Sequence, residues 1–220
     1  MLPIVTLATA RLPDGTPFVL SRRGEEWMVR AGPHLLMSSR SQGSENELAV
    51  QALRRLAAPS RVLVGGLGLG FTLRAVLDRV APTTRVTIAE LVPELVTWNK
   101  EHVGDLAQHP LADPRCEVIV GDVFEAIQSA SKIFDAILLD VDNGPVAVSQ
   151  EKNKRLYSPR GIAACRRALR PGGVLALWSA GPSEKYQRDL ERAGFAVDVL
   201  KVAAAKSGRA KHVIFVATVR

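Results

Sequence analysis

Hydrophobic residues along the chain recur with the periods of buried β-strands and amphipathic helices. The clearest unit begins with an apolar run at residues 62–64 and continues into a glycine-rich segment at residues 65–70. The apolar positions of the next segment share one helical face: Leu73, Val76, Leu77 and Val80. A buried strand, a glycine turn and a helix form the first half of a nucleotide-binding βαβ unit. Glycines permit positive φ and leave the helix N-terminus open to a polar or anionic ligand.

The same analysis predicts further strands and helices in alternation. The predicted strands that follow the first unit lie at residues 86–90, 116–120, 134–140 and 174–178. The predicted helices lie at residues 93–102, 123–128, 159–169 and 184–193. Two last strands, at residues 195–202 and 212–218, are joined by a short connection and predict an antiparallel hairpin. We therefore predict an α/β fold with a Rossmann-like, mostly parallel seven-stranded sheet that ends in this hairpin.

The first 43 residues show a different pattern. Short runs with strand character lie at residues 17–21, 26–30 and 34–38, separated by glycine-containing turns. They predict a small N-terminal β meander over residues 1–43, before a cofactor-binding domain over residues 44–220. At the junction, Ser44 is predicted to cap a helix that begins near Glu45 and to form a capping box with Glu47.

Composition is ordinary for a globular protein, with 47% hydrophobic and 23% charged residues. No apolar run reaches the length of a membrane span, and the N-terminus lacks the basic segment of a signal peptide. We therefore expect a cytoplasmic protein that does not bind membranes. The two cysteines and four histidines have no spacing typical of a metal site, so no metal is expected.

The net charge is +7 and the isoelectric point is about 9.8. This charge is compatible with nucleic acid as a partner, but the basic residues are scattered in pairs and form no long run. A small-molecule substrate is therefore the main expectation. The exposed edges of the predicted meander favour a homodimer.

Acidic residues follow three of the predicted parallel strands. Glu90 lies about twenty residues after the last glycine of the turn, where a carboxylate can accept hydrogen bonds from both ribose hydroxyls. Asp122 suits an adenine amino group, and Asp140 can hold a cationic amine or orient a nucleophile. Because the carboxyl ends of parallel strands meet at one edge, we expect one nucleoside site there. Helix capping or a solvated strand end is the alternative interpretation of Asp122 and Asp140.

Several segments together match a known pattern: residues 62–70, Glu90, residues 113–115, 121–122, 134–140 and 169–175. With them the chain resembles the class I S-adenosylmethionine-dependent methyltransferase fold, and within it the spermidine synthase group. The predicted meander is similar to the small N-terminal domain of that group. Glu47 falls where the group has a glutamate before the first strand, and residues 156–158 resemble the segment after its active-site loop.

The resemblance implies S-adenosylmethionine, or its decarboxylated form, as the cofactor. The expected cofactor-binding residues are Gly66, Gly68, Gly70, Glu90, Leu91, Asp122, Val123 and Asp140. Asp140 and Asp142 are the catalytic candidates. The expected substrate contacts are Glu47, Asn143 and Tyr157, of which Tyr157 either covers the acceptor pocket or anchors the loop.

Two positions and one loop depart from the spermidine synthase pattern. Leu69 stands where that group has an aspartate that helps to hold the amine of the donor. Glu45 stands at the place of a tyrosine. The loop after the fourth strand is shortened and carries basic residues, which disfavour a polycationic substrate.

These departures lead the sequence to predict methyl transfer from S-adenosylmethionine to an unidentified acceptor, with Asp140 or Asp142 assisting proton removal. The first alternative is aminopropyl transfer from decarboxylated S-adenosylmethionine, as in spermidine synthases. A second alternative is an adenosyl-binding protein without catalytic activity. A nicotinamide-dependent dehydrogenase would share the glycine turn and Glu90, but it would not require Gly121 and Asp122.

Overall fold

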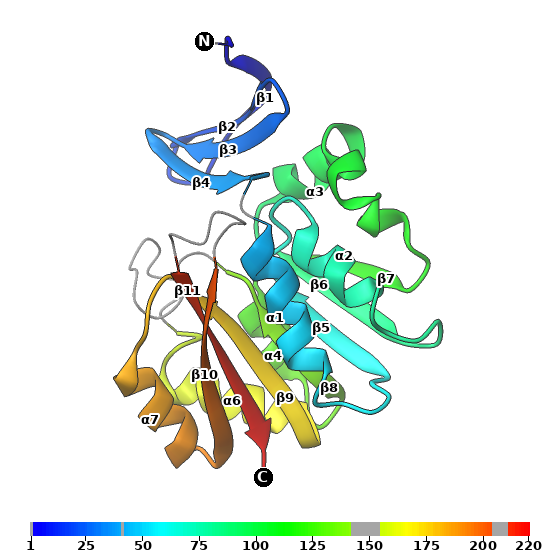
Figure 1. Cartoon of the computed structure of the whole chain (residues 1–220), viewed down its shortest axis with the longest axis vertical. Helices are drawn as coiled ribbons and strands as arrows, with labels where there is room; N and C mark the ends of the chain where they lie inside the picture. The colour runs from blue at the N-terminus through cyan, green and yellow to red at the C-terminus, as the bar shows by residue number, and fades with distance from the viewer. Residues whose placement is uncertain (1, 41, 142–154, 204–210) are drawn as a thin grey trace.

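The computed structural model describes residues 2–40, 42–141, 155–203 and 211–220. A small antiparallel sheet formed by the N-terminal part of the chain lies over one end of a larger unit, in which helices cover a central sheet (Figure 1). The N-terminal sheet thus meets the central unit at the edge where a nucleoside site is expected.

The N-terminal sheet has four strands in chain order. They are β1 (Val5–Arg11), β2 (Pro17–Arg23), β3 (Glu26–Ala31) and β4 (His34–Ser38), each antiparallel to the next. The last three match the predicted runs, whereas β1 was not predicted. β1 is an edge strand with mostly exposed residues, so its sequence carries little of the apolar alternation that marks a half-buried strand.

The central sheet has seven strands in the order β10-β11-β9-β8-β5-β6-β7. Their bounds are β5 (Arg61–Gly65), β6 (Arg85–Glu90), β7 (Cys116–Val120), β8 (Phe134–Leu139), β9 (Leu169–Ser179), β10 (Phe195–Ala203) and β11 (Lys211–Val219). Strands β5 to β9 pair in parallel, and β11 lies antiparallel between β9 and β10. The predicted fold, including the antiparallel C-terminal hairpin, is therefore confirmed.

Helices cover both faces of this sheet and enclose a hydrophobic core on each. On one face lie α1 (Gly43–Leu53), α2 (Phe71–Leu77) and α3 (Pro93–Glu101). On the other lie α4 (Val123–Ser129), α6 (Pro159–Ala168) and α7 (Glu184–Arg192). Two 3₁₀-helices, η1 (Gly104–Ala107) and η2 (Pro110–Ala112), connect α3 to β7. Among the helices of the described residues, none is both long and apolar enough to cross a bilayer.

Side-chain caps fix where three of the helices begin. Asp122 accepts from the backbone N–H of Phe124, Ser158 from that of Gly161, and Ser183 from that of Tyr186. The capping box predicted for α1 is wrong. The helix begins at Gly43, so Ser44 already lies in its first turn, and the hydroxyl of Ser44 bonds to the carboxylate of Glu45 instead.

The segment after α6 also differs from its prediction. The helix was predicted to end at residue 169 and the next strand to begin at residue 174, but β9 already begins at Leu169 and includes residues 170–173. Leu169 pairs with Phe134, and the register against β8 shifts before Ala136 pairs with Val174. Positive φ at Gly172 lets the strand absorb this irregularity without ending.

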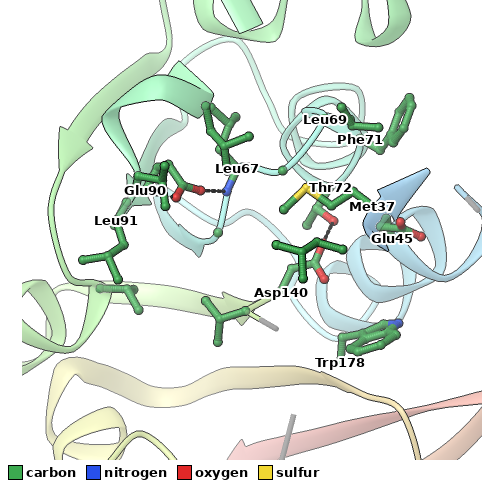
Figure 2. A pocket seen from close by; sticks show the side chains of 18 of the residues that line it. Met37, Glu45, Leu67, Leu69, Phe71, Thr72, Glu90, Leu91, Asp140 and Trp178 are labelled. Atoms are coloured by element: carbon green, nitrogen blue, oxygen red, sulfur yellow. Dashed lines mark hydrogen bonds between the residues drawn. The ribbon is translucent and has the colours of Figure 1, made fainter. Parts of the chain in front are cut away.

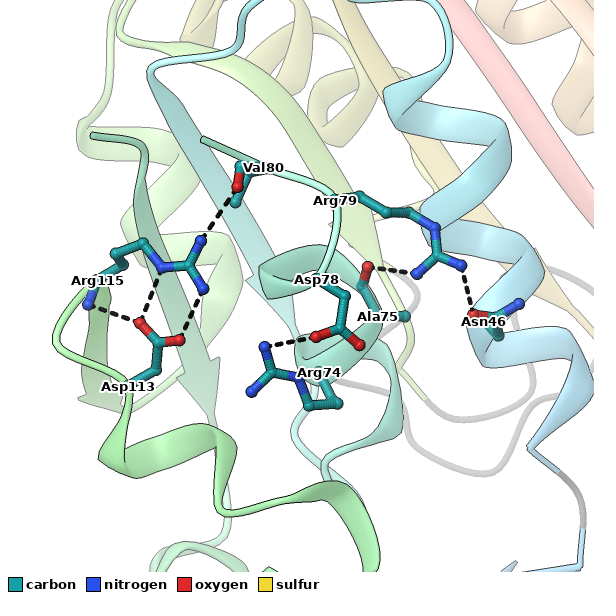
Figure 3. A network of polar contacts seen from close by, with 8 residues as sticks. All are labelled: Asn46, Arg74, Ala75, Asp78, Arg79, Val80, Asp113 and Arg115. Atoms are coloured by element: carbon teal, nitrogen blue, oxygen red, sulfur yellow. Dashed lines mark hydrogen bonds and ion pairs between the residues drawn. The ribbon is translucent and has the colours of Figure 1, made fainter. Parts of the chain in front are cut away.

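A polar network ties the helices on one face to the start of β7 (Figure 3). The guanidinium of Arg115 donates to both carboxylate oxygens of Asp113 and, at 3.1 Å, to the carbonyl oxygen of Val80. These bonds lower the pKa of Asp113 to about 2. Just after α2, Arg79 donates to the carbonyl oxygen of Ala75 at 2.8 Å and to Asn46 at 2.9 Å. These bonds link α2 to α1, which contributes to the cavity described below.

The glycine turn after β5 lies against the ends of two neighbouring strands. Gly66 N donates to Ala89 O of β6 at 2.9 Å, and Asp140 N donates to Gly65 O at 2.8 Å. Gly66 has φ of +90°, and a Cβ atom there would lie 2.3 Å from the carbonyl oxygen of Asp140. Both the backbone conformation and the close approach therefore require glycine at this position.

This close approach predicts a specific cost for Gly66→Ala. We expect the free energy of unfolding to fall by about 3 kcal/mol or more, because the new Cβ collides with rigid backbone. The matched control is Gly172→Ala: this glycine has φ of +74°, but no atom lies within 4 Å of the position that a Cβ would take. The control is expected to cost about 1 kcal/mol, from the backbone conformation alone. Urea denaturation followed by circular dichroism measures both; equal losses would contradict the close approach.

Candidate functional site

A cavity of about 400 Å³ opens where the carboxyl ends of β5, β6 and β8 meet the N-terminal sheet. Its volume lies within the usual range for small-molecule sites. The glycine turn, the end of β6 and the start of α4 form one end. The first turn of α1, the end of β8 and the C-terminal hairpin form the other, and β4 contributes apolar side chains above (Figure 2).

Glu90 lies at the first end and is only 5% exposed. One carboxylate oxygen accepts from Leu67 N and the other from Val92 N, each at 2.8 Å. Two backbone donors therefore fix the orientation of the carboxylate beside the turn (Figure 2). The sequence analysis expected Glu90 at this place, and the structure puts it on the cavity wall.

Asp122 lines the same end and has two partners. One oxygen caps α4 by accepting from Phe124 N at 2.8 Å, and the other pairs with the guanidinium of Arg155. Arg155 in turn lies over the ring of Phe124, 4.9 Å from the ring centroid. Capping and lining a cavity, which the sequence analysis weighed as alternatives, are both present at Asp122.

Asp140 follows β8 at the opposite side of the turn. Its carboxylate accepts from the hydroxyl of Thr72, in the first turn of α2, at 2.5 Å (Figure 2). Together with its backbone bond to Gly65, this contact holds Asp140 at the middle of the cavity, between the nucleoside end and α1.

Glu45 lines the cavity from α1 and is a feature that the sequence analysis did not assign to the site. Its carboxylate accepts at 2.7 Å from the hydroxyl of Ser44, which in turn contacts Nδ1 of His212 at 3.1 Å. Burial raises the pKa of Glu45 to about 7, and the nearby negative charge of Asp140 contributes to the increase. The carboxylates of Glu45 and Asp140 thus share this end of the cavity.

Leu69 occupies the place where the spermidine synthase group has an aspartate. It lines the cavity and is 5% exposed, because it packs in a cluster with Leu95 and Trp98 of α3 and Phe18 of β2. Phe18 stacks on Trp98 with ring centroids 5.0 Å apart. At this position the turn is anchored to the N-terminal sheet by apolar contact, and it presents no charge to a ligand.

Most of the expected cofactor-binding residues line this one cavity: Gly66, Gly68, Glu90, Leu91, Asp122, Val123 and Asp140. Gly70 does not line it. It precedes α2 with a left-handed backbone conformation, so its part is to start that helix.

Two of the expected substrate contacts, Glu47 and Tyr157, lie outside the lining of the cavity. Glu47 does not line the cavity, and its carboxylate accepts from the side chain of Gln51 one turn along α1. Tyr157 is also outside the lining; its hydroxyl donates to Val141 O at 3.2 Å, which fits the interpretation that it anchors the loop. Asp142 and Asn143 lie outside the described residues.

The lining also includes polar and aromatic residues that the sequence analysis did not assign to the site, among them Glu45, Thr72, Trp178 and His212. Trp178 ends the predicted fifth parallel strand, so the rule that found the acids applies to it as well. His212 begins an antiparallel strand, whose N-terminal end falls at the same edge of the sheet. The Trp178 and His212 rings pack edge to face with centroids 4.5 Å apart.

The environment of Glu45 predicts how stability depends on pH. The pKa of Glu45 is raised from 4.5 to about 7 in the folded protein, so folding favours its protonated form and stability falls as the pH rises between these values. We expect Glu45→Gln to be more stable than the parent by about 3 kcal/mol at pH 8 and to lose most of this advantage at pH 5.

Chemical denaturation at both pH values measures this difference. The matched control is Glu47→Gln, the same acid-to-amide change on the same helix but outside the cavity, which is expected to leave the pH dependence unchanged. A Glu45→Gln protein with the same pH dependence as the parent would contradict a buried, protonated Glu45.

Comparison with known proteins gives a consistent result for sequence and structure. The family model described as spermine/spermidine synthase domain matches residues 45–192. The chain is 31% identical over 144 residues to a polyamine aminopropyltransferase of Synechococcus sp. (strain JA-2-3B'a(2-13)), covering 63% of this chain and 44% of that protein. It is 34% identical over 137 residues to polyamine aminopropyltransferase 2 of Pseudomonas aeruginosa, covering 60% of this chain and 37% of that protein. The chain thus spans less than half of the length of these relatives.

Solved structures match over nearly the whole chain. A spermidine synthase in complex with the transition-state analogue AdoDATO superimposes with a TM-score of 0.80 at 18% identity, covering 97% of this chain and 73% of that one. A spermidine synthase from Thermotoga maritima gives a TM-score of 0.78 at 18% identity, covering 97% and 72%. At 18% sequence identity, this structural similarity shows a shared fold and nothing beyond it.

These comparisons correct the main activity predicted from the sequence. Methyl transfer is wrong, because the similar proteins are named polyamine aminopropyltransferases and the matching family is that of spermine and spermidine synthases. The prediction gave too much importance to the loss of the turn aspartate at Leu69. The same end of the cavity holds carboxylates at Glu45 and Asp140, which were not counted together.

Proposed function

Because the chain belongs to the spermine/spermidine synthase domain family, we propose that it transfers an aminopropyl group from decarboxylated S-adenosylmethionine to a small amine. The observation that carries this proposal is the charge of the cavity. Its described lining includes four carboxylates, at Glu45, Glu90, Asp122 and Asp140, and no lysine or arginine. Such a lining favours ligands with ammonium groups over ligands with carboxylates.

The nucleoside part of the donor is proposed to bind at the end formed by the glycine turn. There the oriented carboxylate of Glu90 suits the two ribose hydroxyls. Asp122 and Val123 lie where an adenine ring would reach, and Arg155 must yield its place on Asp122 for the adenine amino group to bond there. Gly66 and Gly68 let the backbone approach the donor closely.

The aminopropyl part would then extend towards Asp140. S-adenosylmethionine carries a carboxylate on the corresponding group, and this carboxylate would face Asp140 and Glu45 across a cavity that is partly shielded from water. The decarboxylated donor keeps only the ammonium group, which the carboxylate of Asp140 attracts. Asp140 therefore supplies the counter-charge that the turn lacks at Leu69.

This proposal predicts the products of a direct assay. With decarboxylated S-adenosylmethionine and 1,4-diaminobutane, we expect methylthioadenosine and the aminopropylated diamine in equal amounts, measured by mass spectrometry. Calorimetric titration is expected to give at least about 10-fold tighter binding of the decarboxylated donor than of S-adenosylmethionine. Binding without any product would support an adenosyl-binding protein instead, and failure of either donor to bind would reject the nucleoside site.

A second prediction concerns the ribose contact. Glu90→Gln removes one charge and one acceptor beside the ribose, so the dissociation constant of the donor is expected to rise by about 10- to 100-fold. Glu117→Gln, on the exposed face of neighbouring β7, is the matched control and is expected to bind normally. Circular dichroism confirms that each variant is folded. Unchanged donor binding in folded Glu90→Gln would contradict the assignment.

A further inference from the structure

Glu45 has the position of a group that meets the acceptor, on the far side of Asp140 from the nucleoside end. Figure 2 shows its side chain on α1 beside Met37 and Thr72, with Asp140 and Trp178 nearby. Resting on the proposed function, we propose that Glu45 is a catalytic residue that binds the acceptor amine and takes up its proton before transfer. Glu45 stands at the place where the spermidine synthase group has a tyrosine.

Hydrogen bonds hold the carboxylate in place for this role. Ser44 is 1% exposed, and its hydroxyl gives its single hydrogen to Glu45. The contact between Ser44 and His212 therefore uses the N–H at Nδ1 of the ring as donor. The Trp178 ring, packed edge to face on His212, restricts the imidazole. Ser44 and His212 are thus positioning residues that aim Glu45 into the cavity.

The charges around Glu45 create a site for a cation. Among the described residues, Asp140 faces it from the end of β8 and His212 from β11; burial lowers the pKa of His212, which favours the neutral ring. Glu90 and Asp122 lie towards the nucleoside end, and Asp122 is paired with Arg155. Burial is the main cause of the raised pKa of Glu45, and the charge of Asp140 adds to it; an ammonium group placed between the two carboxylates is attracted by both.

The reaction balances with Glu45 as base. The acceptor ammonium gives one proton to the Glu45 carboxylate, and the lone pair of the resulting amine attacks the carbon next to the donor sulfonium. A carbon–nitrogen bond forms, the carbon–sulfur bond breaks, and its electron pair stays on sulfur to give neutral methylthioadenosine. A base with a pKa of about 7 can take the proton near neutral pH and release it afterwards.

Apolar side chains beside Glu45 suit the hydrocarbon part of such an acceptor. Leu35, Leu36 and Met37 of β4 line the cavity together with Phe71 at the start of α2, and Figure 2 shows Met37 beside Glu45. An amine whose nitrogen lies at Glu45 would place its methylene groups against these residues. The N-terminal sheet therefore contributes to the acceptor side of the cavity.

The test compares Glu45→Gln with Glu47→Gln, the matched change outside the cavity. For the parent and the control, kcat/KM for 1,4-diaminobutane is expected to rise with pH and to level off near pH 7. In Glu45→Gln we expect kcat/KM to fall by about 100-fold and the inflection to disappear, while donor affinity changes less than about 3-fold. Retention of the parental rate and inflection by Glu45→Gln would overturn the proposal.

A second measurement separates this proposal from the proposed function. Calorimetric titration of the methylthioadenosine-bound protein with 1,4-diaminobutane reports amine binding without turnover. Binding that is at least about 10-fold weaker in Glu45→Gln than in Glu47→Gln supports the amine site, even if the parent transfers no aminopropyl group. Equal binding in the two variants overturns it, whatever the transfer assay shows.

Discussion

The close approach of the glycine turn to the ends of β6 and β8 is the constraint on which the cavity depends. Gly66 touches the backbone of Asp140, and its N–H bonds to β6, so the turn cannot move without disturbing both strands. The same turn gives Leu67 N to Glu90, which fixes the orientation of that carboxylate. The places of Glu90 and Asp140 in the cavity thus depend on the same backbone contact rather than on separate local preferences.

The four carboxylates in the described lining of the cavity have different hydrogen-bond and ion-pair partners. Glu90 receives two backbone N–H groups, Asp122 receives one and a guanidinium, and Asp140 receives a hydroxyl. Glu45 is buried near Asp140, and its raised pKa reflects this burial and the charge beside it. Residues of one chemical type can therefore serve for binding, for orientation and for proton uptake within a single small volume.

Much of the fold could be predicted because its strands are apolar runs and its acids lie at their ends. Glu90, Asp122 and Asp140 were found in this way, and all three line the cavity. Glu45 and His212 could not be found in this way, because their placement depends on the packing of α1 and β11 against the sheet. The predicted capping box also placed the start of α1 near Glu45, whereas the helix begins at Gly43.

The activity was mispredicted for a related reason. The absence of the turn aspartate was interpreted as loss of a counter-charge, although acids from other elements surround the same space. Charge in a cavity is a property of its whole lining, and sequence comparison at one motif position does not reveal it. The leucine that replaces this aspartate stabilises the packing instead, because the side chain of Leu69 fills the contact between the turn, α3 and the N-terminal sheet.

The contribution of β4 to the cavity has an evolutionary consequence. The matching family model begins at residue 45, so β4, which contributes apolar side chains to the cavity, precedes the residues that this model matches. The residues assigned to the nucleoside end (Gly66, Gly68, Glu90, Asp122 and Val123) all follow that point. Exchange of the first forty residues between related chains would thus change the apolar side chains that β4 contributes to the cavity, and would leave the residues of the nucleoside end in place.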